Sequence, residues 1–182
     1  PASVRRFCAP ALPCPASLRG AVFLLACSPV TTLFIADLHL SPDTPALNLA
    51  FQGFLQAHAG QVDALYILGD LFEVWVGDDA LDEAGSFEAE CAALLREAAQ
   101  KRPLFFMVGN RDFLAGDEFL RRSGMTGLTE PTVLHWAGPN ILLSHGDALC
   151  LDDVEYQQFR SLSRSAAWQQ QLLAQPFKPA AA

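Results

Sequence analysis

In the stretch TLFIADLH, residues 32–39, a short apolar run ends in an aspartate and a histidine, two residue types that often bind metals. The run predicts a buried strand over Thr32 to Ala36. In an extended backbone the side chains at positions i and i+2 lie on the same face. Asp37 and His39 are therefore expected to reach the same ion just beyond the strand.

Three further apolar runs end in the same way. They are residues 64–68 before Gly69-Asp70, residues 104–108 before Gly109-Asn110-Arg111-Asp112, and residues 140–144 before His145-Gly146-Asp147. Ligands of α/β proteins gather outside the carboxyl ends of the strands, so the four ends are expected to converge. The glycines are expected to allow sharp turns and a close approach of the backbone to a phosphate.

Helical periodicity separates these runs and fixes the fold class as α/β. Apolar residues at three-to-four spacing predict a helix over 45–59 and another over 86–101, with Ser86 as the N-cap. Residues 132–136 and 140–144 flank Ala-Gly-Pro and predict a hairpin. A long helical stretch is expected over 153–174, ended by prolines.

Composition excludes several classes of protein. The 182 residues fit a single domain, and the net charge of −8 provides no basic field to hold nucleic acid. No apolar run approaches the ~18 residues that a membrane-spanning helix needs. Five cysteines at irregular spacing predict neither a zinc knuckle nor a disulfide framework, and Cys91 is expected to be a small core residue.

The donor types at the strand ends favour a hard divalent metal. Carboxylate, imidazole and amide ligands suit Mn²⁺ or Mg²⁺ better than thiolate-preferring metals. Each fragment alone is weak evidence, but the four together indicate a two-metal hydrolase. His58 and His135 have no partner motif, so both are expected to be structural.

The order Asp-x-His, Gly-Asp, Gly-Asn-x-Asp and Ser-His-Gly-Asp resembles the calcineurin-like metallophosphoesterase superfamily. Longer stretches resemble one of its families, the UDP-2,3-diacylglucosamine diphosphatases of lipid A biosynthesis. These are FIADLHL at 34–40, GDLFE at 69–73, GNRDF at 109–113, HGDALCLDD at 145–153, Tyr156-Gln157 and Phe159-Arg160. The resemblance covers about Thr31 to Pro176.

The resemblance implies a layered α/β sandwich with the start of a helical cap, and it implies roles for individual residues. Asp37 and His39 would hold one metal, Asp70 would bridge both, and Asn110 and His145 would hold the second. The metals would be two Mn²⁺, with Mg²⁺ as the alternative. Asn110, Arg111 and Asp153 would contact the substrate.

The implied reaction is hydrolysis of the pyrophosphate of UDP-2,3-diacylglucosamine to UMP and 2,3-diacylglucosamine 1-phosphate. Two cations lower the pKa of a bound water, and Asp70 is expected to be the least replaceable residue. Many relatives have a proton-donating His after the Asn, whereas Arg111 cannot donate a proton at neutral pH. Arg111 would instead stabilise charge on a pyrophosphate, the alternative being a surface ion pair with Asp112 or Glu73.

The segment after His145 is a candidate surface for acyl chains at the cytoplasmic face of the bacterial inner membrane. Its apolar side chains are Val154, Phe159, Leu162, Trp168, Leu172 and Leu173, and its bases Arg160, Arg164 and Lys178 could face anionic headgroups. The alternative is an ordinary amphipathic helix packed on the sheet. Oligomeric state has no signal in the sequence.

Three segments are expected: an N-terminal extension over 1–30, a metallophosphoesterase core over 31–150 and the start of a cap over 151–182. The extension is interpreted as sequence upstream of a true start at Val30. Relatives of this kind continue to a Gly-His-x-His motif, which this sequence does not reach. An active pyrophosphatase, an inactive fragment that still binds metal or lipid, and a generic phosphoesterase therefore stay open as functions.

Overall fold

The computed structural model describes residues 5–8, 31–135 and 140–174, with only the backbone at 5–8. Five strands form one sheet in the order β1 (Arg5–Cys8), β2 (Thr31–Ile35), β3 (Ala64–Leu68), β4 (Leu104–Met107) and β5 (Thr126–Leu128). β1 is antiparallel to β2, and the other neighbours are parallel. The predicted strands are confirmed to within one residue, whereas β1 and β5 were not predicted. The expected start at Val30 lies outside the described residues.

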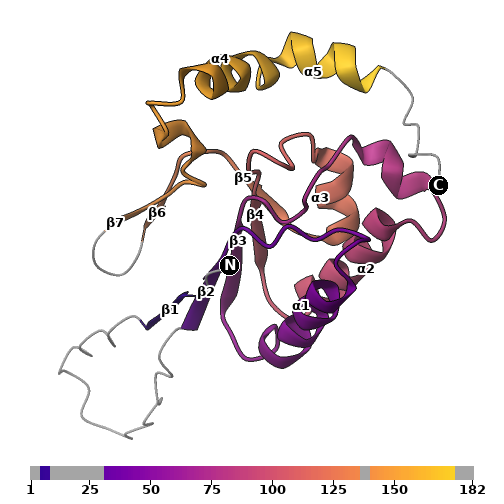
Figure 1. The fold of residues 1–182 in the computed structure, drawn as a ribbon. Coiled ribbons are helices and arrows are strands. Elements are labelled where there is room, and N and C mark those ends of the chain that lie inside the picture. The colour runs from indigo at the N-terminus through magenta and orange to yellow at the C-terminus, as the bar shows by residue number, and fades with distance from the viewer. Residues whose placement is uncertain (1–4, 9–30, 136–139, 175–182) are drawn as a thin grey trace, which may run out of the picture.

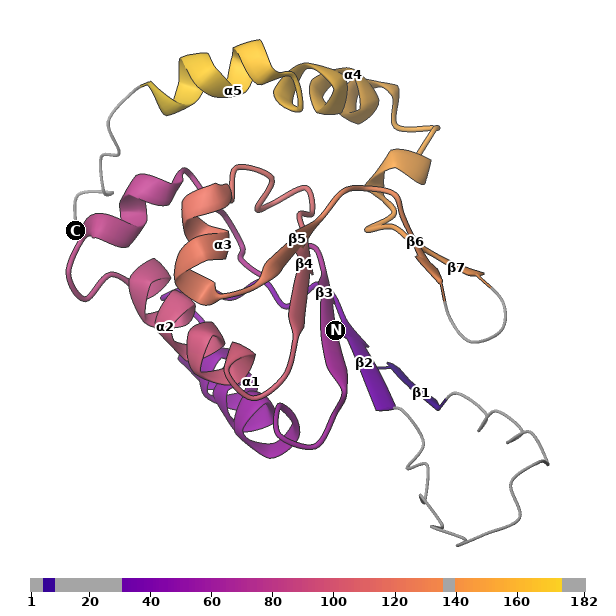
Figure 2. The same ribbon diagram turned by 180° about the vertical axis from the view of Figure 1, so that it is seen from behind.

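Helices cover one face of this sheet (Figures 1 and 2). They are α1 (Pro45–His58), α2 (Phe87–Ala99) and α3 (Asp117–Ser123), with a short 3₁₀ turn, η1, at Asp78–Asp82. The predicted cap of α2 is confirmed, because the Ser86 side chain accepts a hydrogen bond from the backbone of Ala89. Buried side chains from the strands and from α1 and α2, among them Leu65, Leu95 and Phe106, form the main core under these helices.

The predicted hairpin, β6 (Thr132–His135) and β7 (Asn140–Leu143), lies on the other face of the sheet. Leu143 packs there with Phe34, Tyr66 and Met107. The rings of Phe34 and Tyr66 stack with their centroids 5.0 Å apart, so aromatic contacts run across neighbouring strands. The hairpin thereby brings the end of β7 to the ends of β2 and β3.

The helical stretch predicted over 153–174 forms two helices rather than one. After the 3₁₀ turn η2 (Asp147–Leu149), the chain forms α4 (Val154–Ser163) and then α5 (Ala166–Leu173). The break occurs because Ser165 has an extended backbone and its side chain caps α5 at the nitrogen of Trp168. Both helices run above the carboxyl ends of the strands (Figure 1).

No helix within the described ranges combines the length and apolar character needed to cross a bilayer.

Candidate metal centre

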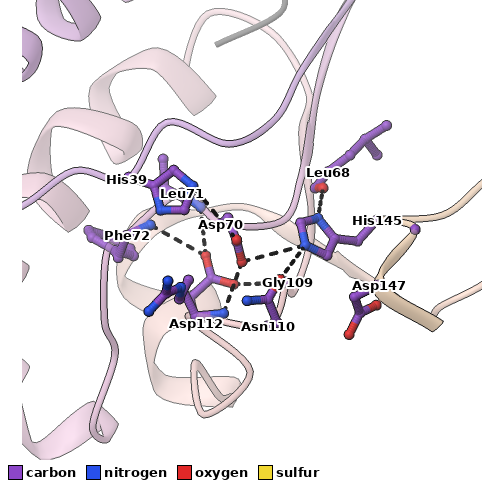
Figure 3. Close-up of polar contacts among 12 residues, drawn as sticks. His39, Leu68, Asp70, Leu71, Phe72, Gly109, Asn110, Asp112, His145 and Asp147 are labelled. Carbon is purple, nitrogen blue, oxygen red and sulfur yellow. Dashed lines mark hydrogen bonds and ion pairs between the residues drawn. The ribbon is translucent and has the colours of Figure 1, made fainter. Parts of the chain in front are cut away.

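Five side chains from four strand ends lie together, as expected. Asp37, Asp70 and His145 each offer one donor atom, and these atoms lie within 4.8 Å of one another. His39 adds Nε2 at 3.8 Å from Asp70 Oδ2, and Asn110 adds Oδ1 at 3.0 Å from His145 Nε2 (Figure 3). The convergence of the strand ends is therefore confirmed, while metal binding by these residues stays a prediction.

The backbone that carries three of these side chains is left-handed. Asp37, His39 and Asp70 have φ angles of 56°, 52° and 51°. The expectation that an extended backbone aligns Asp37 with His39 is therefore wrong. Backbone hydrogen bonds from Leu38 and His39 to the carbonyl of Asp70 turn the chain instead, and this turn keeps both side chains near Asp70.

Two glycines let the loops of the site touch. Gly69 has a φ of 88°, and a Cβ there would overlap the His145 ring and the backbone of Gly109. A Cβ on Gly109 would overlap the backbone nitrogen and carboxylate of Asp70. The sharp turn expected at Gly69 agrees with its positive φ, and both glycines also make room for neighbouring loops. The expected approach of the backbone to a phosphate stays a prediction.

Asp112 links the loop that carries Asp70 to the loop that carries Asn110. Its side chain is fully buried and accepts backbone hydrogen bonds from Leu71 at 2.8 Å and from Gly109 at 2.6 Å. Burial raises the pKa of this carboxyl, although the backbone donors act in the opposite direction. The sequence did not predict this role for Asp112.

Arg111 lies at the outer edge of the site. Its guanidinium Nη1 is 3.6 Å from Glu73 Oε1, and both side chains are about half exposed. The ion pair with Glu73 that was left open as an alternative is thus present. Glu73 Oε2 also lies 2.9 Å from His39 Nδ1, a neighbour that sequence reasoning missed. The backbone nitrogen of Arg111 donates to Asp70 at 2.9 Å.

Asp147, two residues after His145, serves a different purpose. It is buried and accepts hydrogen bonds from the Tyr156 hydroxyl and from Arg160 Nε. Burial acts to raise the pKa of Asp147, but these donors and the nearby Arg164 outweigh it, so the pKa is lowered. The pKa of Tyr156 is raised by burial and by the Asp147 charge.

The expectation that Arg160 and Arg164 face lipid headgroups is therefore wrong. Both side chains are mostly covered, at 23% and 20% exposure, and both point into the protein. Burial lowers the pKa of Arg164, whereas the hydrogen bond to Asp147 raises that of Arg160. Lys178, the third base, lies outside the described residues.

Asp153, predicted to contact substrate, is exposed and caps α4 by accepting from the backbone of Tyr156 at 3.0 Å. His58 packs against the ring of Phe54, and His135 faces Asn140 across the hairpin at 3.0 Å. Neither histidine belongs to the cluster of possible metal donors found in the described part of the chain. Their expected structural roles agree with these contacts.

The donors present fit a divalent metal. In metal sites a histidine commonly gives its second ring nitrogen to a carbonyl or carboxylate, which fixes the ring. His145 Nδ1 lies 2.9 Å from the carbonyl of Leu68, which leaves Nε2 facing Asn110 and Asp70. Together with the carboxylates and the amide, this is a donor set for Mn²⁺ or Mg²⁺.

The comparisons with known proteins agree with this geometry. The family model described as calcineurin-like phosphoesterase matches residues 30–180. A UDP-2,3-diacylglucosamine hydrolase of Chromobacterium violaceum is 56% identical over 143 residues, which are 79% of this chain and 59% of that protein. One from Stenotrophomonas maltophilia is 48% identical over 147 residues, 81% of this chain and 58% of that protein. The chain thus spans under two thirds of the length of these relatives.

Among solved structures, a crystal structure of a Pseudomonas putida nuclease is similar at 26% identity and a TM-score of 0.41, covering 57% of this chain and 50% of that one.

Proposed function

The chain belongs to the calcineurin-like phosphoesterase family, and on that basis we propose that it hydrolyses the pyrophosphate bond of UDP-2,3-diacylglucosamine. The products would be UMP and 2,3-diacylglucosamine 1-phosphate. The observation that carries the proposal is the cluster of Asp37, Asp70 and His145 within 4.8 Å at the strand ends. The names of the relatives at 48% and 56% identity support the substrate.

We propose that Asp37 and His39 hold one metal, that Asn110 and His145 hold the other, and that Asp70 serves both. Two divalent cations supply charge that lowers the pKa of a bound water and neutralises phosphoryl oxygens. We propose Mn²⁺ as the ion, because imidazole and carboxylate ligands together suit it, with Mg²⁺ as the alternative. Asp70 is central in the proposal because both His39 and His145 lie within 3.8 Å of its oxygens.

Arg111 would meet the substrate rather than the metals. A guanidinium stays protonated at neutral pH, so it stabilises negative charge but donates no proton to a leaving group. A nucleotide phosphate leaves as a stable anion, so it needs no proton from the enzyme. The Arg111 side chain is half exposed and pairs with Glu73 at the surface, a contact weak enough for the guanidinium to turn towards a pyrophosphate.

We further propose that residues 31–150 form the phosphoesterase core and that the chain from 151 onward begins a cap over the site. Part of this cap packs on the core, because Trp168 and Leu172 contact it. Leu149, Leu151 and Val154 remain 60–75% exposed. An apolar surface of this kind, which follows His145 closely in the sequence, suits acyl chains and a peripheral position at the cytoplasmic face of the inner membrane.

The test is release of UMP from UDP-2,3-diacylglucosamine in detergent, with Mn²⁺ added and with chelator as the control. The wild-type chain should release UMP only with metal, and Asp70→Asn should lower turnover at least about 100-fold. Glu97→Gln, an exposed acid on α2, is the matched control. Metal-independent turnover, or full activity of Asp70→Asn, would contradict the proposal.

The second candidate is metal and lipid binding without turnover. It would rest on the same donor cluster of Asp37, Asp70 and His145 and on the exposed apolar side chains that follow His145 in the chain. Mn²⁺ binding by calorimetry together with no UMP release would identify this case. Turnover of a simple phosphodiester at a higher rate than the UDP substrate would instead indicate a generic phosphoesterase.

A further inference from the structure

The side chain of Glu130 holds the backbone at His145. Glu130 lies between β5 and β6, and its side chain is only 9% exposed. Its Oε1 accepts hydrogen bonds from the backbone nitrogen of His145 at 2.8 Å and from the Ser144 hydroxyl at 2.9 Å. Gly146, the next residue, has a φ of 104° and also donates to Oε1, at 3.3 Å. One carboxylate oxygen therefore fixes three consecutive residues.

The second oxygen of Glu130 is held by α4. Arg160 Nη2 donates to Oε2 at 2.8 Å, and Arg160 Nε donates to Asp147 at 2.8 Å. The guanidinium of Arg160 thus bridges the carboxylates of Glu130 and Asp147, which lie before and after His145 in the sequence. A buried carboxylate keeps its orientation only while its donors remain in place, because an unpaired buried charge is costly.

The C-cap residue of α4, Arg164, also reaches the loop that carries Asn110. Arg164 Nη2 donates to the carbonyl of Gly109 at 2.7 Å, and its guanidinium lies over the ring of Phe113, 5.0 Å from the centroid. Asn110 and His145 face each other at 3.0 Å, so α4 and its C-cap residue contact both loops of one half of the candidate centre. The other half, at Asp37 and His39, is held by the backbone of Asp70.

We propose that Glu130, held by Arg160, is a positioning residue that sets the affinity of the metal site formed by Asn110 and His145. This inference rests on the proposed function, because it assumes that these residues bind a metal. Glu130 contributes none of the clustered donor atoms, so its effect passes through the backbone of His145. The His145 ring is already held at Nδ1 by Leu68, so a shift of the backbone would misdirect Nε2.

Loss of a residue that holds a metal ligand in place, without binding the metal itself, typically lowers metal affinity about 10- to 100-fold. Glu130→Gln keeps the size of the side chain but turns one oxygen into an NH₂ group. If that group faces Arg160, one contact is lost; if it faces His145, the contacts with the backbone nitrogens of His145 and Gly146 are lost, because all of these groups are donors. Only the half of the centre that contains His145 should weaken.

The experiment is a titration with Mn²⁺ alone. Binding is measured by calorimetry and by the electron paramagnetic resonance signal of the free ion. Wild type should bind two Mn²⁺ per chain. In Glu130→Gln the affinity for one of them should fall at least about tenfold, while the other stays within about twofold. The matched control is Glu118→Gln, because Glu118 on α3 also pairs with two arginines, Arg121 and Arg122.

Arg160→Met provides a second variant if Glu130→Gln fails to fold, and it should weaken the same single site. Thermal unfolding without metal reports the purely structural effect of each change. Equal weakening of both Mn²⁺ sites alongside lower thermal stability would overturn the positioning role, as would unchanged binding. Failure of the wild-type chain to bind Mn²⁺ would instead overturn the proposed function, and the inference with it.

Discussion

The carboxylate of Asp112 lies 2.8 Å from the backbone nitrogen of Leu71, which precedes it by 41 positions. A second hydrogen bond, from Gly109, attaches the same carboxylate to its own loop. Asp112 thus ties the loop of Asp70 to the loop of Asn110 beneath the candidate centre. The contact explains why two segments so far apart in sequence meet in a fixed geometry.

Removal of this carboxylate should be costly. Asp112→Ala leaves buried backbone donors without a partner, at about 1–3 kcal/mol for each, so the free energy of unfolding should fall by about 3 kcal/mol. Urea unfolding measures this change. Asp43→Ala, an exposed acid in the loop before α1, should change stability by less than about 0.5 kcal/mol. A similar fall in the free energy of unfolding in both variants would contradict the role of Asp112 in linking the two loops.

Gly109 and Gly53 form a matched pair for the same substitution. Gly109→Ala places a methyl group against the backbone and carboxylate of Asp70, so it should lower stability by about 2 kcal/mol or more and weaken Mn²⁺ binding. Gly53 lies within α1 with open space around it, so Gly53→Ala should raise stability by about 0.5–1 kcal/mol. Thermal denaturation of both variants tests the pair, and a stable Gly109→Ala would refute the close approach.

Arg111 should separate activity from stability. If it stabilises charge on the substrate, Arg111→Met should lower turnover about 100-fold. The exposed ion pair with Glu73 adds at most about 1 kcal/mol to stability. Arg111→Met should therefore lower turnover strongly while leaving the free energy of unfolding, measured in urea, nearly unchanged. A variant with normal turnover would mean that Arg111 serves only the surface ion pair.

The cysteines Cys91 and Cys150 should differ in reactivity. Burial, reinforced by the charges of Glu88 and Glu90, raises the pKa of Cys91 to about 12, so the thiolate needed for alkylation is scarce at pH 8. Cys150 is exposed. Iodoacetamide should label the Cys150 peptide much faster than the Cys91 peptide, as followed by mass spectrometry. In urea the two should react alike, and equal rates in the folded chain would exclude a buried Cys91.

Much of the fold could be predicted because its signals are local. Apolar runs and three-to-four spacing predicted β2, β3, β4, α1 and α2, and the donor residues at the strand ends predicted the cluster. The short α3 gives no such signal, because its first turn is held by a distant carboxylate. Asp78 accepts from the backbone of Gly116 and Phe119, 38 and 41 positions away.

The supporting contacts of the site were beyond sequence reasoning for the same reason. Glu130 stands in no motif, and its role depends on Arg160, 30 positions later. The bases in and just after α4 have a charge pattern that is typical of a membrane-facing helix, yet Arg160 and Arg164 pair with buried carboxylates. Only tertiary packing decides whether such side chains face a membrane or pair with buried carboxylates. The sequence shows their charge but not which way they point.

The left-handed conformations at Asp37, His39 and Asp70 restrict which amino acids those positions accept. Asparagine, aspartate and histidine enter this region of backbone space far more readily than glutamate, glutamine or branched residues do. Each position therefore has two simultaneous requirements, one chemical and one steric. Swaps that preserve charge, such as Asp to Glu, would fail for a reason unrelated to ligation, so mutational tolerance at these sites should be narrower than coordination chemistry alone allows.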